Sequence, residues 1–131
     1  MIPPPWEYHP FVDIPTLTVN EAIAQRRQLH KKKVRVRGVY TVGREHSALE
    51  SLSEPNVLDR QGRHQIWIQF PALRKSEVKH RPEEYHRSPV EIYGTFNADG
   101  HGHMSVYAAE INMIEITKLP PSPMEPREVP Q

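Results

Sequence analysis

Apolar and polar residues alternate with a period of two along several stretches of this chain, and this pattern restricts the possible folds more than any other feature. Successive side chains of a β-strand point to opposite faces, so the alternation predicts strands with one buried face. The stretches are residues 34–42, 47–52 (the weakest), 65–70 and 90–96. A last strand is expected from about residue 104 to residue 118, with a bulge near residues 111–114, where the alternation slips. The sequence therefore predicts five strands.

The same alternation assigns side chains to the faces of their strands. The residues expected to face the core are Val34, Val36, Gly38, Tyr40, Val42, Ile66, Ile68, Phe70, Val90, Ile92, Gly94 and Phe96. The neighbours of these residues are expected to face outward. Among them, Arg35, Arg37, Trp67 and Tyr93 are the candidates for a binding face, because aromatic rings and guanidinium groups dominate binding surfaces.

A helix is expected before the first strand. Thr18 and Glu21 have the spacing of a capping box, in which each side chain bonds to the backbone amide of the other residue. Cations crowd the stretch that follows, where the helix dipole favours positive charge, so the helix is expected to end near Lys32. Residues 72–88 predict an irregular helical connector that is broken at Pro82.

The predicted order is a helix, three strands, a connector helix and two strands. Five strands with a helix between the third and the fourth is the layout of the OB-fold, a small Greek-key barrel. Gly38 and Gly94 lie in mid-strand, where a tight barrel bends and side chains would collide. We therefore predict a mainly β chain with a five-stranded OB-like β-barrel. An α+β roll with a curved sheet is the alternative.

Fourteen prolines mark the ends of the folded part. Five lie within residues 1–15 and five within residues 120–131. Because proline lacks an amide donor and has a fixed φ, both ends are expected to be extended. The predicted organisation is a proline-rich arm (1–15), an OB-like domain (16–119) and a proline-rich flexible tail (120–131).

Charge and composition exclude several classes of protein. The 131 residues include 17 Lys and Arg against 16 Asp and Glu, a formal net charge of +1, which argues against binding by non-specific electrostatic attraction alone. No apolar run approaches the ~18 residues of a membrane span. The first residues lack the pattern of a signal peptide, so a cytoplasmic protein without a membrane partner is expected. The absence of cysteine excludes disulfides and thiolate catalysis.

Several stretches resemble a group of small uncharacterised bacterial proteins. Residues 32–39 resemble the strand that reads GKKVRVxG in that group, and residues 45–49 resemble its FExxALY. The further matches are Ile66-Trp67-Ile68, Gly94-Thr95-Phe96-Asn97, Gly102-His103-Met104 and a final strand that resembles xGxIxxIxR. The similarity covers about residues 17–119, although Arg44 replaces a usual aromatic residue and the glycine before the lysine pair is absent. The resemblance implies an OB-type domain, similar in architecture to those that bind tRNA anticodons, and implies no activity.

Cations are concentrated in one segment of the chain. Seven of the seventeen are Arg26, Arg27, Lys31, Lys32, Lys33, Arg35 and Arg37. Together with outward-facing Trp67 and Tyr93, they would suit single-stranded nucleic acid, which needs rings for stacking and cations for phosphates. The other interpretation is that the rings are covered by the proline-rich arm or by a partner, and that the cations are solvated. We favour a protein partner, because nucleic-acid-binding OB faces typically have more rings and more excess charge.

Trp6, Tyr8 and Phe11 lie among the prolines of the N-terminal arm. A stiff segment of this kind loses little conformational entropy when it binds. These rings are expected to dock on the chain's own barrel or on a second subunit. A proline motif for another domain is the third possibility.

His46, His101 and His103 are the candidates for a metal site, since three imidazoles can hold zinc. The spacing is unspecific, with no cysteine and no HExxH motif. We interpret them as structural residues, with a buried His103 that donates to a backbone carbonyl and fixes its turn. No metal and no cofactor are expected.

No arrangement of residues predicts catalysis. Glu45, His46 and Ser47 are consecutive, but neighbours in a strand point to opposite faces and cannot form a triad. The chain also lacks a phosphate-binding loop, a nucleophile elbow and a dinucleotide fingerprint. The sequence is therefore interpreted as a non-enzymatic OB-type module that binds a protein, as an immunity-like inhibitor or an assembly subunit. Single-stranded nucleic-acid binding through the outward strand face is the alternative.

Overall fold

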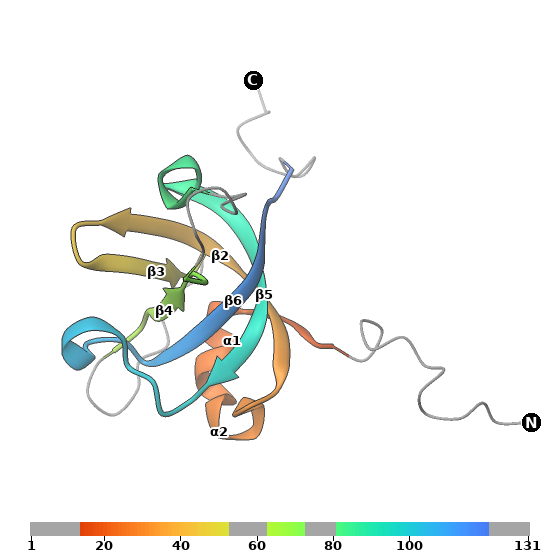
Figure 1. Cartoon of the computed structure of the whole chain (residues 1–131). Coiled ribbons are helices and arrows are strands. Elements are labelled where there is room, and N and C mark those ends of the chain that lie inside the picture. The colour runs from red at the N-terminus through yellow and green to blue at the C-terminus, as the bar shows by residue number, and fades with distance from the viewer. Residues whose placement is uncertain (1–13, 53–62, 73–80, 121–131) are drawn as a thin grey trace, which may run out of the picture.

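The computed structural model describes residues 14–52, 63–72 and 81–120. The elements, in chain order, are β1 (Thr16–Thr18), α1 (Val19–Ala24), α2 (Arg26–Leu29), β2 (Lys33–Gly43), β3 (His46–Glu50), β4 (Ile66–Gln69), the 3-10 helix η3 (Pro82–Tyr85), β5 (Ser88–Asn97), the 3-10 helix η4 (His103–Ser105) and β6 (Ala109–Lys118). Figure 1 shows a small barrel with the two α-helices packed at one end. Within the described ranges, no helix has the length and apolar character needed to cross a membrane.

The strands close into a barrel in the order β2-β3-β4-β6-β5, and β5 returns to pair with β2. Neighbouring strands are antiparallel except for β4 and β6, which are parallel. With η3 between the third and fourth barrel strands, this is the topology of an OB-like barrel. The predicted fold class is confirmed, and the alternative of an α+β roll is wrong because β2 and β5 close the sheet.

Two glycines let neighbouring strands pass closely enough for this closure. A Cβ on Gly38 would lie 2.6 Å from the carbonyl oxygen of Glu50. A Cβ on Gly94 would collide with the carbonyl oxygen of Asn112 and lie 2.9 Å from the Cα of Met113. The obstacles at Gly94 are backbone atoms, which cannot rotate away. The prediction that side chains would collide at both positions is confirmed.

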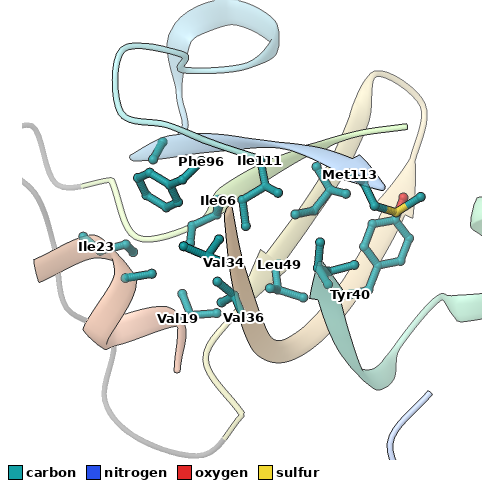
Figure 2. Close-up of a cluster of buried hydrophobic side chains, with 14 of the residues drawn as sticks. Val19, Ile23, Val34, Val36, Tyr40, Leu49, Ile66, Phe96, Ile111 and Met113 are labelled. Atoms are coloured by element: carbon teal, nitrogen blue, oxygen red, sulfur yellow. The ribbon is translucent and has the colours of Figure 1, made fainter. Parts of the chain in front are cut away.

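One hydrophobic core fills the barrel. The residues assigned to the inner face are buried, except Val42 and Phe70, which are partly buried and pack against the core. Figure 2 shows Val34, Leu49 and Ile111, from three different strands, meeting inside the barrel. The period-two pattern therefore predicted the core correctly.

The barrel is least regular between β3 and β4, which are joined by only two residue pairs within the described segments. Beside these pairs, the hydroxyl of Ser47 donates to the carbonyl oxygen of Ile68 at 2.8 Å. The Tyr40 hydroxyl lies 2.7 Å from the same Ser47 oxygen. Burial raises the pKa of Tyr40, so its hydroxyl keeps its proton and donates to Ser47. Side-chain hydrogen bonds thus complete a seam that the backbone leaves open.

The predicted capping box begins α1. The Thr18 hydroxyl accepts from the Glu21 amide at 3.0 Å, and the Glu21 carboxylate accepts from the Thr18 amide at 2.8 Å. The helix is interrupted at Gln25 and ends at Leu29, three residues before the predicted end. Lys31 has a φ of 68° and donates its amide to the carbonyl of Phe96, so the backbone has already left the helix there.

No feature of the sequence predicted β1, which pairs in parallel with the first half of β2. Thr16 lies opposite Arg35, and the Arg35 amide donates to the carbonyl of Pro15 at 2.9 Å. A strand of three residues is too short to show alternation. It exists because β2 is long enough to hold β1 and β3 on the same edge.

The last strand begins at Ala109, five residues later than predicted. Gly102, Met104 and Ser105 have φ values of 65°, 61° and 56°, which no strand adopts. Residues 103–105 form η4 instead.

The bulge predicted within β6 is confirmed. Tyr93 of β5 pairs with Glu115, but the next residue, Gly94, pairs with Met113. Ile114 is therefore the extra residue on the bulged strand. Its insertion explains why the apolar alternation slips at this point of the sequence.

Only the end of the predicted connector lies within the described residues. There, Pro82 begins η3, because proline suits the first helical position, where no amide donor is needed. Tyr85, at the other end of η3, joins the core. Residues 73–80 of the connector lie outside the described residues. So do Trp6, Tyr8 and Phe11 and the tail from residue 121, and the predictions made for them stay predictions.

Candidate functional site

The four residues predicted for one binding face lie on two sides of the barrel. Arg35 and Arg37 are on β2 and Tyr93 is on the adjacent strand β5, whereas Trp67 is on β4. β3 separates β4 from β2, and β6 separates β4 from β5. The structure therefore brings Arg35, Arg37 and Tyr93 together and places Trp67 on the opposite wall. The idea of a single stripe of rings and guanidinium groups was wrong.

We call Arg35, Arg37, Glu91 and Tyr93 the β2–β5 patch. Nε of Arg37 lies 2.9 Å from Oε1 of Glu91, and Nε of Arg35 lies 3.8 Å from Oε2 of the same carboxylate. The Arg35 guanidinium also lies over the Tyr93 ring, 5.6 Å from its centroid. One carboxylate thus holds both arginines, which reduces the positive charge that the patch offers to a ligand.

The rest of the basic segment is divided between paired and solvated cations. Arg27 contacts Asp99 at 2.5 Å, and His30 lies 3.5 Å from the same carboxylate. Residues 31–33 are three exposed lysines, and none of them makes an ion pair within the part of the chain that the structure describes. These lysines add exposed positive charge next to the β2–β5 patch.

Trp67 faces outward from β4, as predicted, but its own chain covers part of it. Its ring meets the edge of the Tyr107 ring at a centroid distance of 5.1 Å. Gly102 lies so close that a Cβ there would be 2.6 Å from Tyr107 and 2.7 Å from Trp67. The indole nitrogen donates to Oε1 of Gln69 at 3.1 Å. Trp67 therefore supports a loop and offers only part of its ring for stacking.

Tyr107 and His46 extend this outer cluster. Nδ1 of His46 lies 2.7 Å from the Tyr107 hydroxyl, and Nε2 lies 2.8 Å from the hydroxyl of Thr41. Tyr107 is almost completely buried, and burial raises the pKa of its phenol, which keeps it protonated. Both imidazole nitrogens take part in this network. His46 therefore links β3 to the loop that contains Tyr107.

The loop before β6 is held in an unusual conformation by several contacts. The Tyr107 amide donates to the carbonyl of His101 at 3.1 Å, and Nδ1 of His101 donates to the carbonyl of Tyr107 at 2.9 Å. Arg63 donates to the carbonyl of Ser105 at 3.2 Å. The loop nevertheless leaves Met104 77% and Val106 56% exposed. A fixed backbone thus presents two apolar side chains to solvent.

A second loop joins the first one. Arg44 and Glu45 form the turn between β2 and β3, and Glu45 has a φ of 57°. Its carboxylate oxygen Oε1 lies 2.6 Å from Nε2 of His103. We call the exposed residues of the two loops the loop-tip surface: Arg44, Glu45, His103, Met104, Ser105 and Val106. In OB barrels, the loops and strands at this position form a common ligand-binding face.

The three histidines considered for a metal site have separate roles. His46 bonds to two hydroxyl groups, His101 bonds to a backbone carbonyl, and His103 pairs with Glu45. No group of three possible metal ligands occurs among the described residues. The hydrogen bond to a backbone carbonyl that was predicted for His103 is made by His101, which is partly buried, whereas His103 is 42% exposed.

Sequence reasoning considered Glu45 and His103 for other roles and missed the exposed apolar residues of the loop-tip surface. Residues 104–108 were assigned to a strand, which hid the exposure of Met104 and Val106 and the burial of Tyr107. Two glycines, Gly100 and Gly102, within three residues were the available signal of an irregular loop.

Comparisons with known proteins add a distant likeness in structure. No family model matches the chain. No curated protein matches it either. One similar solved structure is a crystal structure named as an aspartyl-tRNA synthetase of Leishmania major Friedlin, with 14% sequence identity and a TM-score of 0.47. The match covers 79% of this chain and 20% of that chain, so this chain spans about a fifth of that structure. The family resemblance inferred from the sequence stays a prediction.

Proposed function

We propose that this chain is a non-enzymatic interaction module that binds a protein partner through the loop-tip surface. The observation that carries the proposal is the exposure of Met104 and Val106 on a loop whose backbone is fixed by hydrogen bonds. A preorganised loop loses little entropy on binding. Methionine is common at protein-binding surfaces because its flexible thioether adapts to the partner.

Backbone strain at this surface supports the proposal. Five non-glycine residues of the described segments have positive φ, and three of them, Glu45, Met104 and Ser105, lie in the two loops. Such a conformation costs about 1–2 kcal/mol per residue. Strained residues cluster at binding and catalytic sites because the surrounding structure holds them there for a function.

The arrangement of charge also suits a protein partner. The Glu45–His103 pair and Arg44 lie beside the apolar side chains of Met104 and Val106. An apolar centre with a polar rim is the usual organisation of a protein–protein interface. The near balance of charge on this surface is less suited to a polyanion.

The non-enzymatic part of the proposal is supported by the positions of Glu45, His46 and Ser47. Ser47 bonds to Ile68 and Tyr40 in the barrel seam, whereas His46 bonds to side chains on the outer face. His46 and Ser47 thus point to opposite faces of β3, as a strand requires. Glu45 turns toward His103 instead of His46.

The test is quantitative affinity purification of the full chain and of a Met104→Ser, Val106→Ser double variant. We expect a protein that the wild-type chain retains to be recovered at least about tenfold less with the double variant, since truncated hot spots cost about 2 kcal/mol or more. A photo-crosslinking amino acid placed at position 104 should attach to the same protein. This second readout separates direct contact from indirect loss.

The matched control is Ile114→Ser, because Ile114 is 49% exposed but lies on β6 away from both loops. This variant should retain the partner as the wild-type chain does. If all three chains retain the same proteins in the same amounts, the loop-tip surface is not a docking site and the proposal is wrong.

The β2–β5 patch favours a second candidate function, single-stranded nucleic-acid binding. Tyr93 and Arg35 form a stacked pair, and the exposed lysines at residues 31–33 lie just before and at the start of β2, the strand of Arg35. Rings next to cations can hold bases and phosphates together. The carboxylate of Glu91, which holds both arginines, is the main argument against this candidate.

Fluorescence anisotropy with a labelled oligodeoxythymidine tests the second candidate. If the patch binds nucleic acid, Glu91→Gln should strengthen binding several-fold because it releases two arginines, and Tyr93→Ala should weaken it at least about fivefold by loss of stacking. Binding should also fall steeply as salt is added. A salt-independent signal, or equal affinities for the two variants, would remove this candidate.

A further inference from the structure

Three consecutive lysines lead from the end of α2 into the first residue of β2. We call these residues, Lys31, Lys32 and Lys33, the lysine cluster. All three are exposed, and none of them makes an ion pair with a residue that the structure describes. Figure 1 shows α2 at the end of the barrel where β2 begins and β5 ends. The lysine cluster therefore concentrates positive charge at that end.

Backbone hydrogen bonds fix the position of the lysine cluster. The Lys31 amide donates to the carbonyl of Phe96 at 2.8 Å, and the Phe96 amide donates to the carbonyl of Lys32 at 2.9 Å. Lys33 then pairs with Thr95 where β2 runs beside β5. Because these bonds tie the segment to β5, the three charges cannot separate by a change of the backbone. An anion meets a site that is already assembled.

The stability of the fold does not explain this arrangement. Lys31 has a φ of 68° at the second position after α2, where glycine or asparagine is usual because a side chain disfavours this conformation. Adjacent cations also repel each other. The dipole of α2, a helix of only four residues, offers little compensation. Three lysines at this place are costly for the isolated chain, and a bound anion would remove the repulsion.

A carboxylate close to the lysine cluster shows which anion this end of the barrel accepts. Asp99 lies in the turn that follows β5, 2.5 Å from Nη2 of Arg27 and 3.5 Å from Nε2 of His30. The cations of the α2 segment thus already hold one carboxylate of the chain. The lysine cluster follows His30 directly in the sequence and has no such partner among the described residues. Further carboxylates from a ligand would extend the same pattern.

The surroundings favour a short acidic peptide over nucleic acid. No Phe, Tyr or Trp occurs in residues 26–33, so bases have no ring of this segment to stack on. The formal net charge of +1 also gives the whole chain little attraction for a long polyanion. Lysine contacts an anion as a point charge on a flexible stem, which suits carboxylates in many orientations.

We propose that the lysine cluster binds an acidic segment of a partner protein, whose Asp and Glu carboxylates pair with the ammonium groups of Lys31, Lys32 and Lys33. An extended segment places every second carboxylate on one face, about 6.8 Å apart, within reach of the flexible lysine side chains. Asp99 opposes binding, because it repels the ligand and occupies Arg27. This contact involves none of the residues of the loop-tip surface, so it goes beyond the function proposed above.

Fluorescence anisotropy of a labelled, capped peptide of six alternating Asp and Glu residues tests the proposal with the full chain. The triple variant Lys31→Gln, Lys32→Gln, Lys33→Gln should weaken binding at least about tenfold, because the ion pairs are lost. Replacing the same three residues with arginine should keep the affinity within about threefold. Asp99→Asn should strengthen binding several-fold, because it removes the repelling carboxylate and releases Arg27.

The matched control removes three positive charges from the other end of the barrel. It is the triple variant Arg81→Gln, Arg87→Gln, Lys118→Gln, in which all three parent residues are exposed. Arg87 precedes β5 and Lys118 pairs with Val90 near the start of β5, whereas the lysine cluster adjoins the end of β5. At about 0.15 M salt, charges this far apart are screened, so the control should bind the peptide as the wild-type chain does.

Nuclear magnetic resonance of the ¹⁵N-labelled chain locates the contact. The peptide should shift the amides of residues 31–33 and of Asp99 and leave those of the loop-tip surface unchanged. Equal losses of affinity in the two triple variants would overturn the proposal, because they indicate general attraction. Tighter binding of an oligodeoxythymidine of the same charge, or of vesicles containing phosphatidylserine, would also overturn it. These variants leave Met104 and Val106 intact, so failure here and failure of the loop-tip surface are separate results.

Discussion

Replacing Gly94 with alanine is expected to destabilise the barrel by about 3 kcal/mol or more, because the folded structure has no space for the added methyl group. Its Cβ would collide with the carbonyl oxygen of Asn112 and approach Ile111 and the Cα of Met113 to 2.9 Å. These atoms belong to the strand that pairs with β5 at the bulge, so relief requires the two strands to separate. Urea unfolding followed by circular dichroism measures the loss as a lower midpoint.

Gly43→Ala is the control for this experiment. Gly43 is also a strand glycine, but a Cβ there would meet no atom within 4 Å. The free energy of unfolding should change by less than about 1 kcal/mol, and alanine can even stabilise the chain by restricting its unfolded state. If the two variants unfold at the same urea concentration, close packing at Gly94 does not hold the barrel together.

Gly102→Ala is expected to displace the loop that covers Trp67 and to cost about 2–3 kcal/mol. Gly102 has a φ of 65°, which disfavours any side chain, and a Cβ would lie 2.6 Å from Tyr107 and 2.7 Å from Trp67. The loop can relieve this overlap only by moving away from both rings. In a Trp6→Phe background, where Trp67 is the one remaining tryptophan of the sequence, its emission should shift to the red and acrylamide should quench it more strongly.

Ser105→Gly provides the matched change in the same loop. Ser105 is exposed and has a φ of 56°, a value that glycine adopts without strain. Trp67 emission should stay as in the parent chain, and the midpoint of unfolding should not fall. Unchanged emission in Gly102→Ala would contradict the packing of this loop on Trp67 and would weaken the proposal that the loop is a rigid docking element.

The local features of the fold could be predicted because each depends on residues close in sequence. Alternation assigned the core, the spacing of Thr18 and Glu21 gave the capping box, and the slip in pattern near Ile114 gave the bulge. The errors lie at element ends. Lys31 and Met104 adopt positive φ, which their residue types do not announce, and each marks a place where an expected element is absent.

The candidate site was harder to predict because it depends on which strands become neighbours. The alternation correctly predicted that Trp67 and Tyr93 face outward, but it could not predict that they lie on opposite walls of the barrel. It also gave no sign that Glu91 holds both Arg35 and Arg37. The pairing of these residues comes from the register between β2 and β5, across more than fifty positions of the chain.

By itself, the sequence determined that this chain forms five barrel strands, which residues fill the core, and where glycine must replace a side chain. Those properties follow from the period of a strand and from steric volume, and neighbouring residues encode both. Tertiary structure alone decided which surfaces exist: the closed barrel placed Trp67 and Tyr93 on opposite walls, and the loop of Gly102 folded over Trp67. A binding surface is made of residues distant in sequence, so it is defined only once strand order and register place them side by side.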